Sequence, residues 1–371
     1  MSKLILSLDG GGIRGAATTQ FLQLVEKELR RGAGPRSIRS CVDFYAGTST
    51  GSIIALGLAT TNLSMDDINS LYNVTNARKI FKENRGWFEW DGVNAPRYEG
   101  SGKSEVLKKN FGEATLAEVA RNKGVLAVTY AVERRVPMVL KSTNPDFAEL
   151  PAWQVADASS AAPTYFPTRD LELKQVSTDD FWLVDGGVIA NNPTMCAIAE
   201  VRREWGTPMS DMSVLSIGTG YVSRKINGPA SRHWGAAQWV TKGDLLSIVT
   251  DERIVSYQTM NLIDPGRCIR VNAEMKKQPG LPNPPDDAMD DISPANLRKL
   301  RDMGKWWFDL YGADVVKLLK ERNLAASVDS VDPESGKPVV RAAGSAPAAR
   351  GSKAVVKRSK VSKAKTKAVR R

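Results

Sequence analysis

The chain has 371 residues, three cysteines and a formal net charge of +11 at pH 7. Its length fits one large α/β domain or two smaller ones. Three widely spaced cysteines do not make a disulfide framework, so we expect reduced thiols and a cytoplasmic chain. No run of about 18 apolar residues occurs, which argues against a membrane-spanning helix. We expect no signal peptide, because a strand-like run begins within a few residues of the N-terminus.

The first predicted strand, residues 4–8, leads into a glycine-rich loop at residues 9–15 with the sequence DGGGIRG. A helix is predicted from residue 16 to residue 31. Consecutive glycines leave backbone N–H groups unshielded at a helix N-terminus, where anions bind. Three of the glycines also fit a dinucleotide-binding fingerprint, but the acidic residue expected about 20 positions later, after a second strand, is missing. We therefore favour an oxyanion hole, in which one donor typically contributes about 10²–10³ in rate.

A second glycine-flanked motif, Gly-Thr-Ser-Thr-Gly, occupies residues 47–51. Apolar stretches precede and follow it, at residues 42–46 and 53–59. This is the layout of a nucleophile elbow, in which a tight turn joins a strand to a helix. Gly47 and Gly51 would avoid the clashes that neighbouring Cβ atoms cause in such a turn. Ser49 is therefore the candidate nucleophile.

A serine nucleophile needs a base, and the chain offers two candidates. Its single histidine, His233, lies in a stretch with no other catalytic signature, so we favour a surface or packing role for it. A short apolar strand is predicted at residues 181–184, and it ends in Asp185, which Gly186 and Gly187 follow. Glycines let another group approach the carboxylate closely, and a carboxylate beside a serine hydroxyl can take its proton directly. An Asp-Gly turn without catalytic function is the alternative.

In their order along the chain, the motifs at residues 9–15, 47–51 and 185–187 closely resemble the patatin-like phospholipase family. The resemblance covers roughly residues 3–220. Three further segments are similar to sequences of that family: residues 158–167, 188–193 and 216–220.

The resemblance implies hydrolysis of glycerophospholipid acyl esters by a Ser–Asp dyad without histidine. Ser49 matches the nucleophile, and Asp185 matches the base that later activates water against an acyl-enzyme. The residues matching the oxyanion loop are Gly10, Gly11, Gly12 and Arg14. The scarcity of histidine agrees with this chemistry. We expect no metal and no cofactor, because no Cys or His pairs occur at ligand spacing and no calcium-loop motif is present.

The remaining pattern alternates strands with helices. Strands are predicted at residues 126–132, 138–141 and 214–217, and a helix at residues 192–204. Such alternation indicates a mostly parallel sheet covered by helices on both faces, which fits the three-layer α/β fold that the resemblance implies. Sites in these sheets form at the carboxyl ends of strands. Ser49, Asp185 and the glycine-rich loop each follow a predicted strand, so we expect them to converge.

Two segments are candidates for lid or regulatory elements. Residues 87–90 (WFEW) and 96–98 are rich in aromatic side chains, which favours core anchors over a lid that touches a bilayer. Residues 221–310 form the second segment. Within it, Ser293 and the following proline are typical of a helix start, and the aromatic residues 306–308 are expected to dock on the body.

Residues 1–325 are predicted to form the acyl hydrolase domain, and residues 333–371 a disordered basic tail. The tail holds twelve Lys or Arg and one acidic residue, so it carries the whole net charge, and the rest of the chain is neutral. Without aromatic residues, Leu or Ile, the tail cannot bury a core. It suits an anionic membrane surface, at about 1 kcal/mol per basic residue. We rank nucleic acid below lipid because base stacking needs aromatic side chains. A solubilising role is the alternative.

The resemblance also includes compact bacterial enzymes that cyclic nucleotides switch on in anti-phage defence. It therefore suggests a cyclic-nucleotide activator, a membrane phospholipid substrate and a peripheral position at the inner membrane. Two alternatives stay open: a lysolipid or neutral-lipid esterase, and a lipid- or nucleic-acid-binding protein with an inactive dyad.

Overall fold

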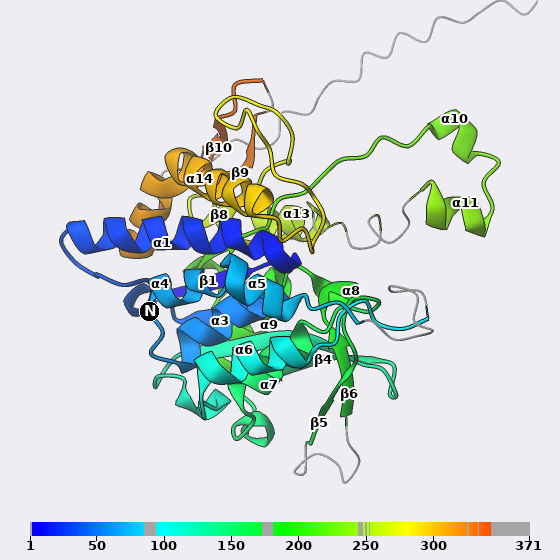
Figure 1. Cartoon of the computed structure of the whole chain (residues 1–371). Coiled ribbons are helices and arrows are strands. Elements are labelled where there is room, and N and C mark those ends of the chain that lie inside the picture. The colour runs from blue at the N-terminus through cyan, green and yellow to red at the C-terminus, as the bar shows by residue number, and fades with distance from the viewer. Residues whose placement is uncertain are drawn as a thin grey trace, which may run out of the picture.

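The computed structural model describes residues 2–84, 94–172, 181–243, 248, 251, 253–324, 326–332 and 334–342. Within these residues, a ten-stranded sheet has the order β10-β9-β8-β7-β1-β2-β3-β6-β5, and β4 pairs with β3 (Figure 1). The strands are β1 (Lys3–Leu8), β2 (Phe44–Thr48), β3 (Gly124–Ala131), β4 (Val136–Lys141), β5 (Arg169–Leu171), β6 (Phe181–Asp185), β7 (Met212–Ile217), β8 (Cys268–Val271), β9 (Ala326–Val331) and β10 (Pro338–Ala342). The helices are α1 (Gly15–Arg31), α2 (Ile38–Cys41), α3 (Thr50–Thr60), α4 (Met65–Ser70), α5 (Val74–Ile80), α6 (Ser101–Phe111), α7 (Ala152–Ser159), α8 (Gly187–Ala190), α9 (Thr194–Trp205), α10 (Gly228–Ser231), α11 (Ala236–Thr241), α13 (Arg253–Leu262) and α14 (Pro294–Glu321).

The sheet is mostly parallel, as the sequence predicts. β1 runs parallel to β2 and β7, and the parallel pairing continues through β2–β3, β7–β8 and β8–β9. Antiparallel pairs occur towards the two ends of the sheet: β9–β10 at one end, and β3–β4, β3–β6 and β5–β6 at the other.

Side chains of β1 alternate between two cores because successive residues of a strand face opposite sides of the sheet. Leu4, Leu6 and Leu8 belong to the larger core, together with buried residues of α1, α3 and α14. Ile5 points the other way, into a smaller core with buried residues of α9. Helices therefore cover both faces, which confirms the predicted three-layer α/β architecture.

Helices α1 and α14 lie side by side on one face (Figure 1). A Cβ at Gly304 of α14 would lie 2.5 Å from the carbonyl oxygen of Ala17 in α1, so glycine is needed where the two backbones approach. The start of α14 is as predicted: Ser293 is the N-cap, and its hydroxyl accepts from the N–H of Asn296. Trp307 is fully buried, which confirms that the aromatic cluster docks on the body.

The folded chain extends further than the sequence predicts. β9 pairs in parallel with β8, and β10 turns back to pair antiparallel with β9. Pro338–Ala342 therefore forms a strand within the segment predicted to be disordered from residue 333, and the sheet does not end at residue 325. An edge hairpin pairs with a sheet that already exists, so it does not need the Leu, Ile or aromatic residues on which the prediction rested. Residues 343–371 lie outside the described part of the chain.

The aromatic segment is described in part. Residues 87–90 lie outside the described residues. Tyr98 is buried, its ring centroid lies 5.2 Å from that of Phe81, and its hydroxyl donates to Asp290 Oδ2 at 2.7 Å. For Tyr98, the predicted role as a core anchor is confirmed.

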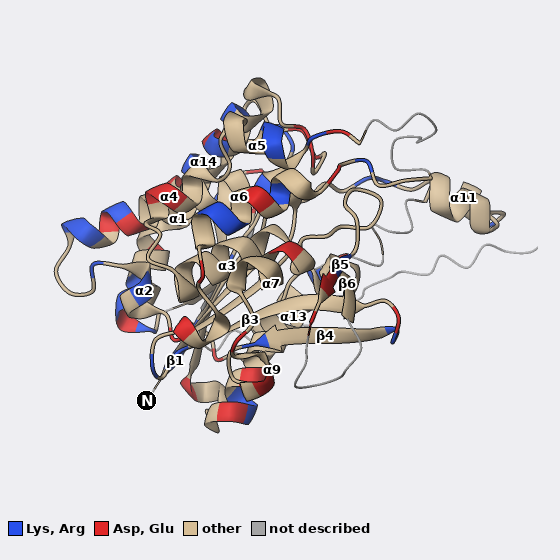
Figure 2. Ribbon diagram, turned by 60° about the horizontal axis from the view of Figure 1, so that its bottom comes forward, with Lys and Arg blue, Asp and Glu red and all other residues tan. Residues whose placement is uncertain are grey.

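Basic and acidic residues are interspersed on surface helices such as α1 and α6 (Figure 2), in keeping with a body whose charges balance. Among the helices of the described residues, none combines the length and the apolar character needed to cross a bilayer.

Candidate active site

Ser49 lies in the tight turn between β2 and α3. Its backbone adopts φ 54° and ψ −126°, which is uncommon for a residue with a side chain. A Cβ at Gly47 would lie 2.3 Å from the carbonyl oxygen of Gly51, and a Cβ at Gly51 would lie 2.1 Å from that of Leu8. Both flanking positions therefore require glycine, and the predicted strand–turn–helix layout is confirmed.

Two strands that share one edge of β3 bring Asp185 to Ser49. β4 occupies the other edge of β3. β2 pairs with β3 as far as Val128, and β6 pairs with it from Thr129 onward, in the opposite direction. β2 and β6 therefore meet head-on along this edge. Ser49 follows the last residue of β2, and Asp185 is the last residue of β6.

The cause of this convergence differs from the one that the sequence predicts. The convergence of Ser49 and Asp185 was expected because carboxyl ends of parallel strands lie at one edge of a sheet. β6 is antiparallel to β3, so that reason is wrong for Asp185. The two residues converge because β6 is short and stops where β2 ends.

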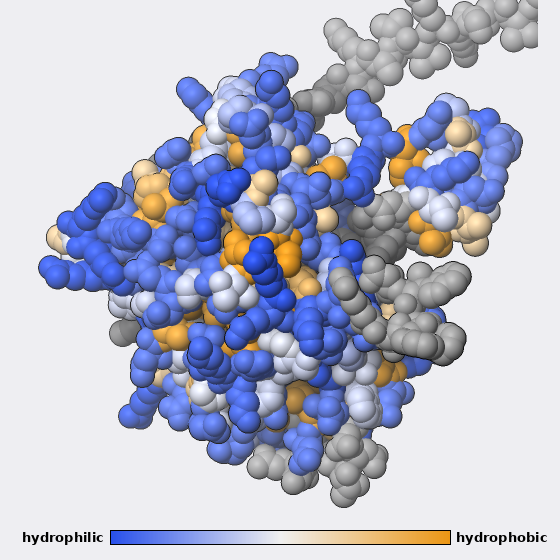
Figure 3. All heavy atoms as spheres, in the orientation of Figure 1, coloured by the Kyte–Doolittle hydropathy of each residue, from blue (hydrophilic) through white to orange (hydrophobic). Residues whose placement is uncertain are grey.

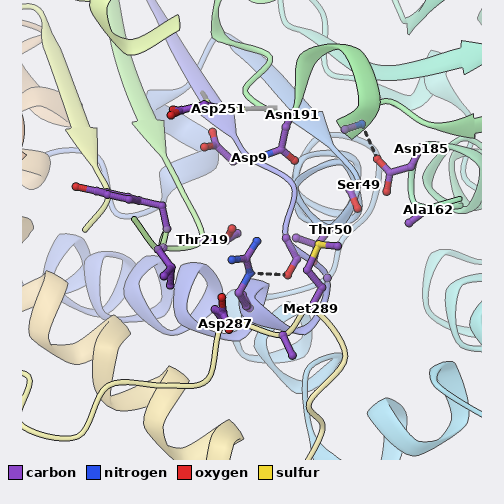
Figure 4. Close-up of a pocket in the computed structure, with 18 of the residues that line it drawn as sticks. Asp9, Ser49, Thr50, Ala162, Asp185, Asn191, Thr219, Asp251, Asp287 and Met289 are labelled. Atoms are coloured by element: carbon purple, nitrogen blue, oxygen red, sulfur yellow. Dashed lines mark hydrogen bonds between the residues drawn. The ribbon is translucent and has the colours of Figure 1, made fainter. Parts of the chain in front are cut away.

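Asp185 is buried beside Ser49 (Figure 4), and their exposed fractions are 4% and 8%. The N–H of Gly187 donates to Asp185 Oδ1 at 2.7 Å. Burial raises the pKa of Asp185 to about 6, while the nearby hydroxyl of Ser49, the N–H of Gly187 and the charge of Lys103 act to lower it. A carboxyl group with this pKa is mostly ionised at neutral pH and can accept a proton from a serine hydroxyl.

The glycine-rich loop follows β1 and passes close to Ser49. A Cβ at Gly10 would lie 3.1 Å from Ser49 Cβ and 2.1 Å from Asn191 Oδ1, so no side chain fits there. The N–H of Gly10 donates to the carbonyl of Asn191 at 3.1 Å. Gly10 was predicted as part of the oxyanion hole, but its N–H is already engaged. Within the described residues, the N–H groups of Gly11 and Gly12 have no hydrogen-bond partner, so they are the available donors of this loop.

Arg14 orients the peptide between these two glycines. Its backbone N–H and its Nε–H both donate to the carbonyl of Gly11, at 3.1 and 3.2 Å. In a trans peptide the carbonyl and the following N–H point in opposite directions. The bonds from Arg14 to the Gly11 carbonyl therefore turn the N–H of Gly12 away from the Arg14 side chain. Arg14 holds the loop rather than donating to the cavity by these two groups.

A distant segment, residues 286–291, covers the glycine-rich loop. The carbonyl of Met289 accepts from the N–H of Ile13 at 2.9 Å, and a Cβ at Gly12 would lie 2.3 Å from that carbonyl oxygen. Asp290 accepts hydrogen bonds from the side chains of Arg97 and Tyr98. This cover belongs to the segment that the sequence marks as a lid or regulatory region.

A buried ion pair that the sequence did not predict supports the glycine-rich loop from the neighbouring strands of the sheet. Arg270 of β8 donates to Asp9 Oδ1 at 2.9 Å and to Ser216 Oγ at 2.8 Å. Burial raises the pKa of Asp9, and the charge of Arg270 opposes this. The two residues lie 261 positions apart, and no local pattern marks Arg270. Only the parallel packing of β1, β7 and β8 brings them together.

Ser49, Asp185, Gly11 and Gly12 line a cavity of about 1280 Å³. This volume exceeds the 300–1,000 Å³ typical of small-molecule pockets. Part of its lining is apolar and suits a hydrocarbon chain; these residues are Ile53, Leu71, Ile80, Phe81 and Phe166.

The single histidine does not take part in this arrangement. His233 is exposed in the segment that links α10 and α11, and it is not among the residues that line the cavity. The geometry therefore gives Ser49 a carboxylate neighbour and no imidazole neighbour.

Comparison with known proteins agrees with this geometry. The family model described as patatin-like phospholipase matches residues 6–198. Patatin-like protein 2 of Oryza sativa subsp. indica is 30% identical over 282 residues, which cover 66% of this chain and 68% of the rice protein. Patatin-like protein 4 of Arabidopsis thaliana is 28% identical over 344 residues, covering 82% of this chain and 83% of that protein.

A bacterial relative is also similar. The cGAMP-activated phospholipase of Escherichia coli (strain TW11681) is 34% identical over 233 residues, which cover 58% of this chain and 61% of the relative. The family match spans more than half of the chain, and the three motifs of the cavity lie within it. The chain therefore belongs to the patatin-like phospholipase family and is a phospholipase or esterase.

Proposed function

We propose that this enzyme hydrolyses fatty-acyl esters of membrane glycerophospholipids through a dyad of Ser49 and Asp185. The observation that carries the proposal is the head-on meeting of β2 and β6 in a partly apolar cavity. Where these two strands end, the hydroxyl of Ser49, whose backbone is strained, lies beside a buried carboxyl group that is ionised at neutral pH.

In the first half-reaction, Ser49 Oγ attacks the ester carbonyl carbon and its proton passes to Asp185. The N–H groups of Gly11 and Gly12 stabilise the negative oxygen of the tetrahedral intermediate. Its collapse breaks the ester bond, and Asp185 returns the proton to the departing alcohol oxygen of the lysophospholipid.

In the second half-reaction, Asp185 takes a proton from water, and the hydroxide oxygen attacks the acyl-enzyme on Ser49. The free fatty acid leaves, and Ser49 regains its proton. One buried carboxyl thus serves twice, as the base that creates each nucleophile and as the acid that protonates each leaving oxygen.

We further propose that a cyclic nucleotide gates this activity, as part of antiviral defence, and that the enzyme acts at the surface of an anionic membrane. The support for gating is the similarity to a bacterial relative whose name states activation by cGAMP. The support for membrane attraction is the basic composition of residues 343–371.

The test is fatty-acid release from vesicles of phosphatidylethanolamine and phosphatidylglycerol in equal parts, with and without a panel of cyclic nucleotides. We expect release that Ser49→Ala abolishes and that Ser101→Ala, a change of an exposed serine on α6, preserves. Release that depends on one nucleotide would support gating. Equal release by wild type and Ser49→Ala would refute the dyad, and release from lysolipid or triglyceride alone would favour an esterase of those substrates.

A further inference from the structure

One tripeptide, residues 159–161, holds the backbone of both Ser49 and Asp185. The N–H of Ser49 donates to Ser159 Oγ at 3.2 Å, and that hydroxyl donates to the carbonyl of Val128 at 2.7 Å. Two residues later, the carbonyl of Ala161 accepts from the N–H of Asp185 at 3.0 Å. The separation of Ser49 and Asp185 therefore depends on where this tripeptide sits.

A buried lysine anchors the middle of the tripeptide. Lys103 of α6 is 2% exposed, and its Nζ lies 2.8 Å from the carbonyl oxygen of Ser160, 2.9 Å from that of Asp157 and 3.1 Å from Ser160 Oγ. An ammonium group has three N–H donors, so these oxygens account for its hydrogen bonds. Asp157 Oδ1 adds an ion-pair contact at 3.1 Å.

The cluster around Lys103 carries an excess positive charge. Asp157 pairs with Lys103 and also with Arg169, whose Nε lies 3.0 Å from Asp157 Oδ2. Two cations and one carboxylate leave a net charge of +1. Lys103 also lines the cavity, and its charge acts to lower the pKa of Asp185. An ionised Asp185 would balance the cluster.

We propose that Lys103 is a positioning residue of the reaction: it fixes residues 159–161, and with them the separation of Ser49 and Asp185, and its charge favours the ionised base. This proposal rests on the dyad proposed above. A structural role alone would explain the hydrogen bonds of Lys103, but it would not connect Lys103 to the pH dependence of turnover.

The test measures kcat between pH 5 and pH 9 on a soluble ester for three variants. Lys103→Met should lower kcat by about 10²-fold through misplacement of the reacting groups, and it should move the acid limb above its wild-type position near pH 6. Asp157→Asn removes a negative charge from the cluster, so its acid limb should move to lower pH. Lys109→Met, at an exposed position on the same helix, is the matched control and should match wild type.

The opposite shifts make the proposal falsifiable even if one variant folds poorly. A folded Lys103→Met with an unmoved acid limb, or equal directions of shift in the Lys103 and Asp157 variants, would overturn it. Asp185→Asn is measured in parallel. Turnover by Asp185→Asn would refute the dyad itself. An inactive Asp185→Asn, together with unmoved acid limbs in the Lys103 and Asp157 variants, would refute only the role of Lys103.

A second, independent observation concerns the surface around the cavity mouth. Val188, Val222, Ile248 and Tyr257 line the cavity, and each is also exposed to solvent. Single exposed apolar residues need no explanation, but a group of them at one opening marks an interaction surface.

Val240 of α11 and Ile254 of α13 are 64% and 59% exposed, and each is close in sequence to a residue that lines the cavity, Lys242 and Arg253 respectively. Figure 3 shows apolar residues beside hydrophilic ones on the projecting segment that carries α10 and α11. Lys225 and Lys242 also line the cavity, and both are exposed.

These exposed apolar residues and lysines form a rim around the cavity mouth. The geometry points to this rim as the face that docks on an anionic phospholipid bilayer. Apolar side chains with flanking lysines are typical of surfaces that insert at the boundary between head groups and acyl chains. Docking there would place the cavity mouth on the bilayer, so a lipid could enter without crossing water. This inference rests on the proposed phospholipid substrate.

The test is sedimentation of the full chain, carrying Ser49→Ala, with vesicles of phosphatidylethanolamine and phosphatidylglycerol in equal parts. Val240→Asp combined with Ile254→Asp should weaken binding by at least about tenfold. Val136→Asp, at an exposed position of β4 that does not line the cavity, is the control and should bind as the parent does. Removing residues 343–371 should weaken binding separately, through lost charge.

Unchanged binding of the double variant would overturn the rim proposal, as would loss of self-association in sedimentation velocity without loss of vesicle binding. In the active background, Ser49-dependent hydrolysis of a soluble ester checks the catalytic chemistry. Failure of docking and failure of the proposed reaction therefore give different results.

Discussion

Replacing the buried carboxyl of Asp185 by an amide should inactivate the enzyme and stabilise its fold at the same time. The pKa of Asp185 is raised from 3.8 to about 6 by burial. Because the folded state holds this proton more tightly than the unfolded state, the ionised form costs stability, and the cost grows as pH rises from about 4 to about 6. The shift of about two units corresponds to roughly 3 kcal/mol once Asp185 is fully ionised.

Asp185→Asn removes this cost. At pH 8 we expect the variant to have a free energy of unfolding up to about 3 kcal/mol above wild type, and near pH 4 we expect little difference. This figure already includes the favourable interaction of the Asp185 carboxylate with the positive charge of Lys103, because that charge is one of the causes of the net pKa shift. Turnover of a soluble ester should disappear, since an amide cannot accept the proton of Ser49.

The assay is urea unfolding of wild type and Asp185→Asn at pH 4, 6 and 8, with Asp170→Asn, an exposed position on β5, as the control. In wild type, kcat should fall below about pH 6 as Asp185 becomes protonated. An Asp185→Asn variant that is less stable than wild type at pH 8, or that retains turnover, would refute this reasoning.

Three further predictions concern the histidine, the elbow and the end of the fold. His233→Ala should change turnover by less than about twofold; a loss of about 10²-fold or more would indicate a histidine base. Gly51→Ala should destabilise the protein by at least about 1–3 kcal/mol in urea unfolding, because its Cβ would meet the carbonyl of Leu8. Gly228→Ala is the control and should not destabilise the protein, because the space around Gly228 is open. Equal stabilities of the two variants would contradict the packing argument. A chain that ends at residue 342 should keep the Tm of the full chain, and one that ends at residue 325 should melt several degrees lower because β8 loses its neighbour; identical melting curves would show that β9 and β10 contribute nothing.

The sequence by itself determined the features that depend on local sterics. A serine in a strained turn needs glycine on both sides, so the elbow around Ser49 was predictable from five residues. The glycine-rich loop and the aspartate at the end of an apolar strand are equally local. Alternation of strands and helices was enough for a mostly parallel sheet, since few architectures bury such elements.

The tertiary structure decided how these pieces serve one another. β6 runs opposite to the direction assumed, and Asp185 meets Ser49 because two short strands share one edge of β3. The N–H of Gly10 donates a hydrogen bond to the carbonyl of Asn191, and no sequence motif predicts this bond.

The charged residues beneath the site could not be predicted either. Arg270 reaches Asp9 across 261 positions, and Lys103 reaches the turn after α7 from another helix. Hydrogen bonds and ion pairs depend on distances of about 3 Å between atoms that only packing brings together, and sequence spacing does not encode those distances. Local backbone geometry can therefore be predicted from the sequence, whereas the hydrogen-bond and ion-pair partners of each polar group are set by the fold.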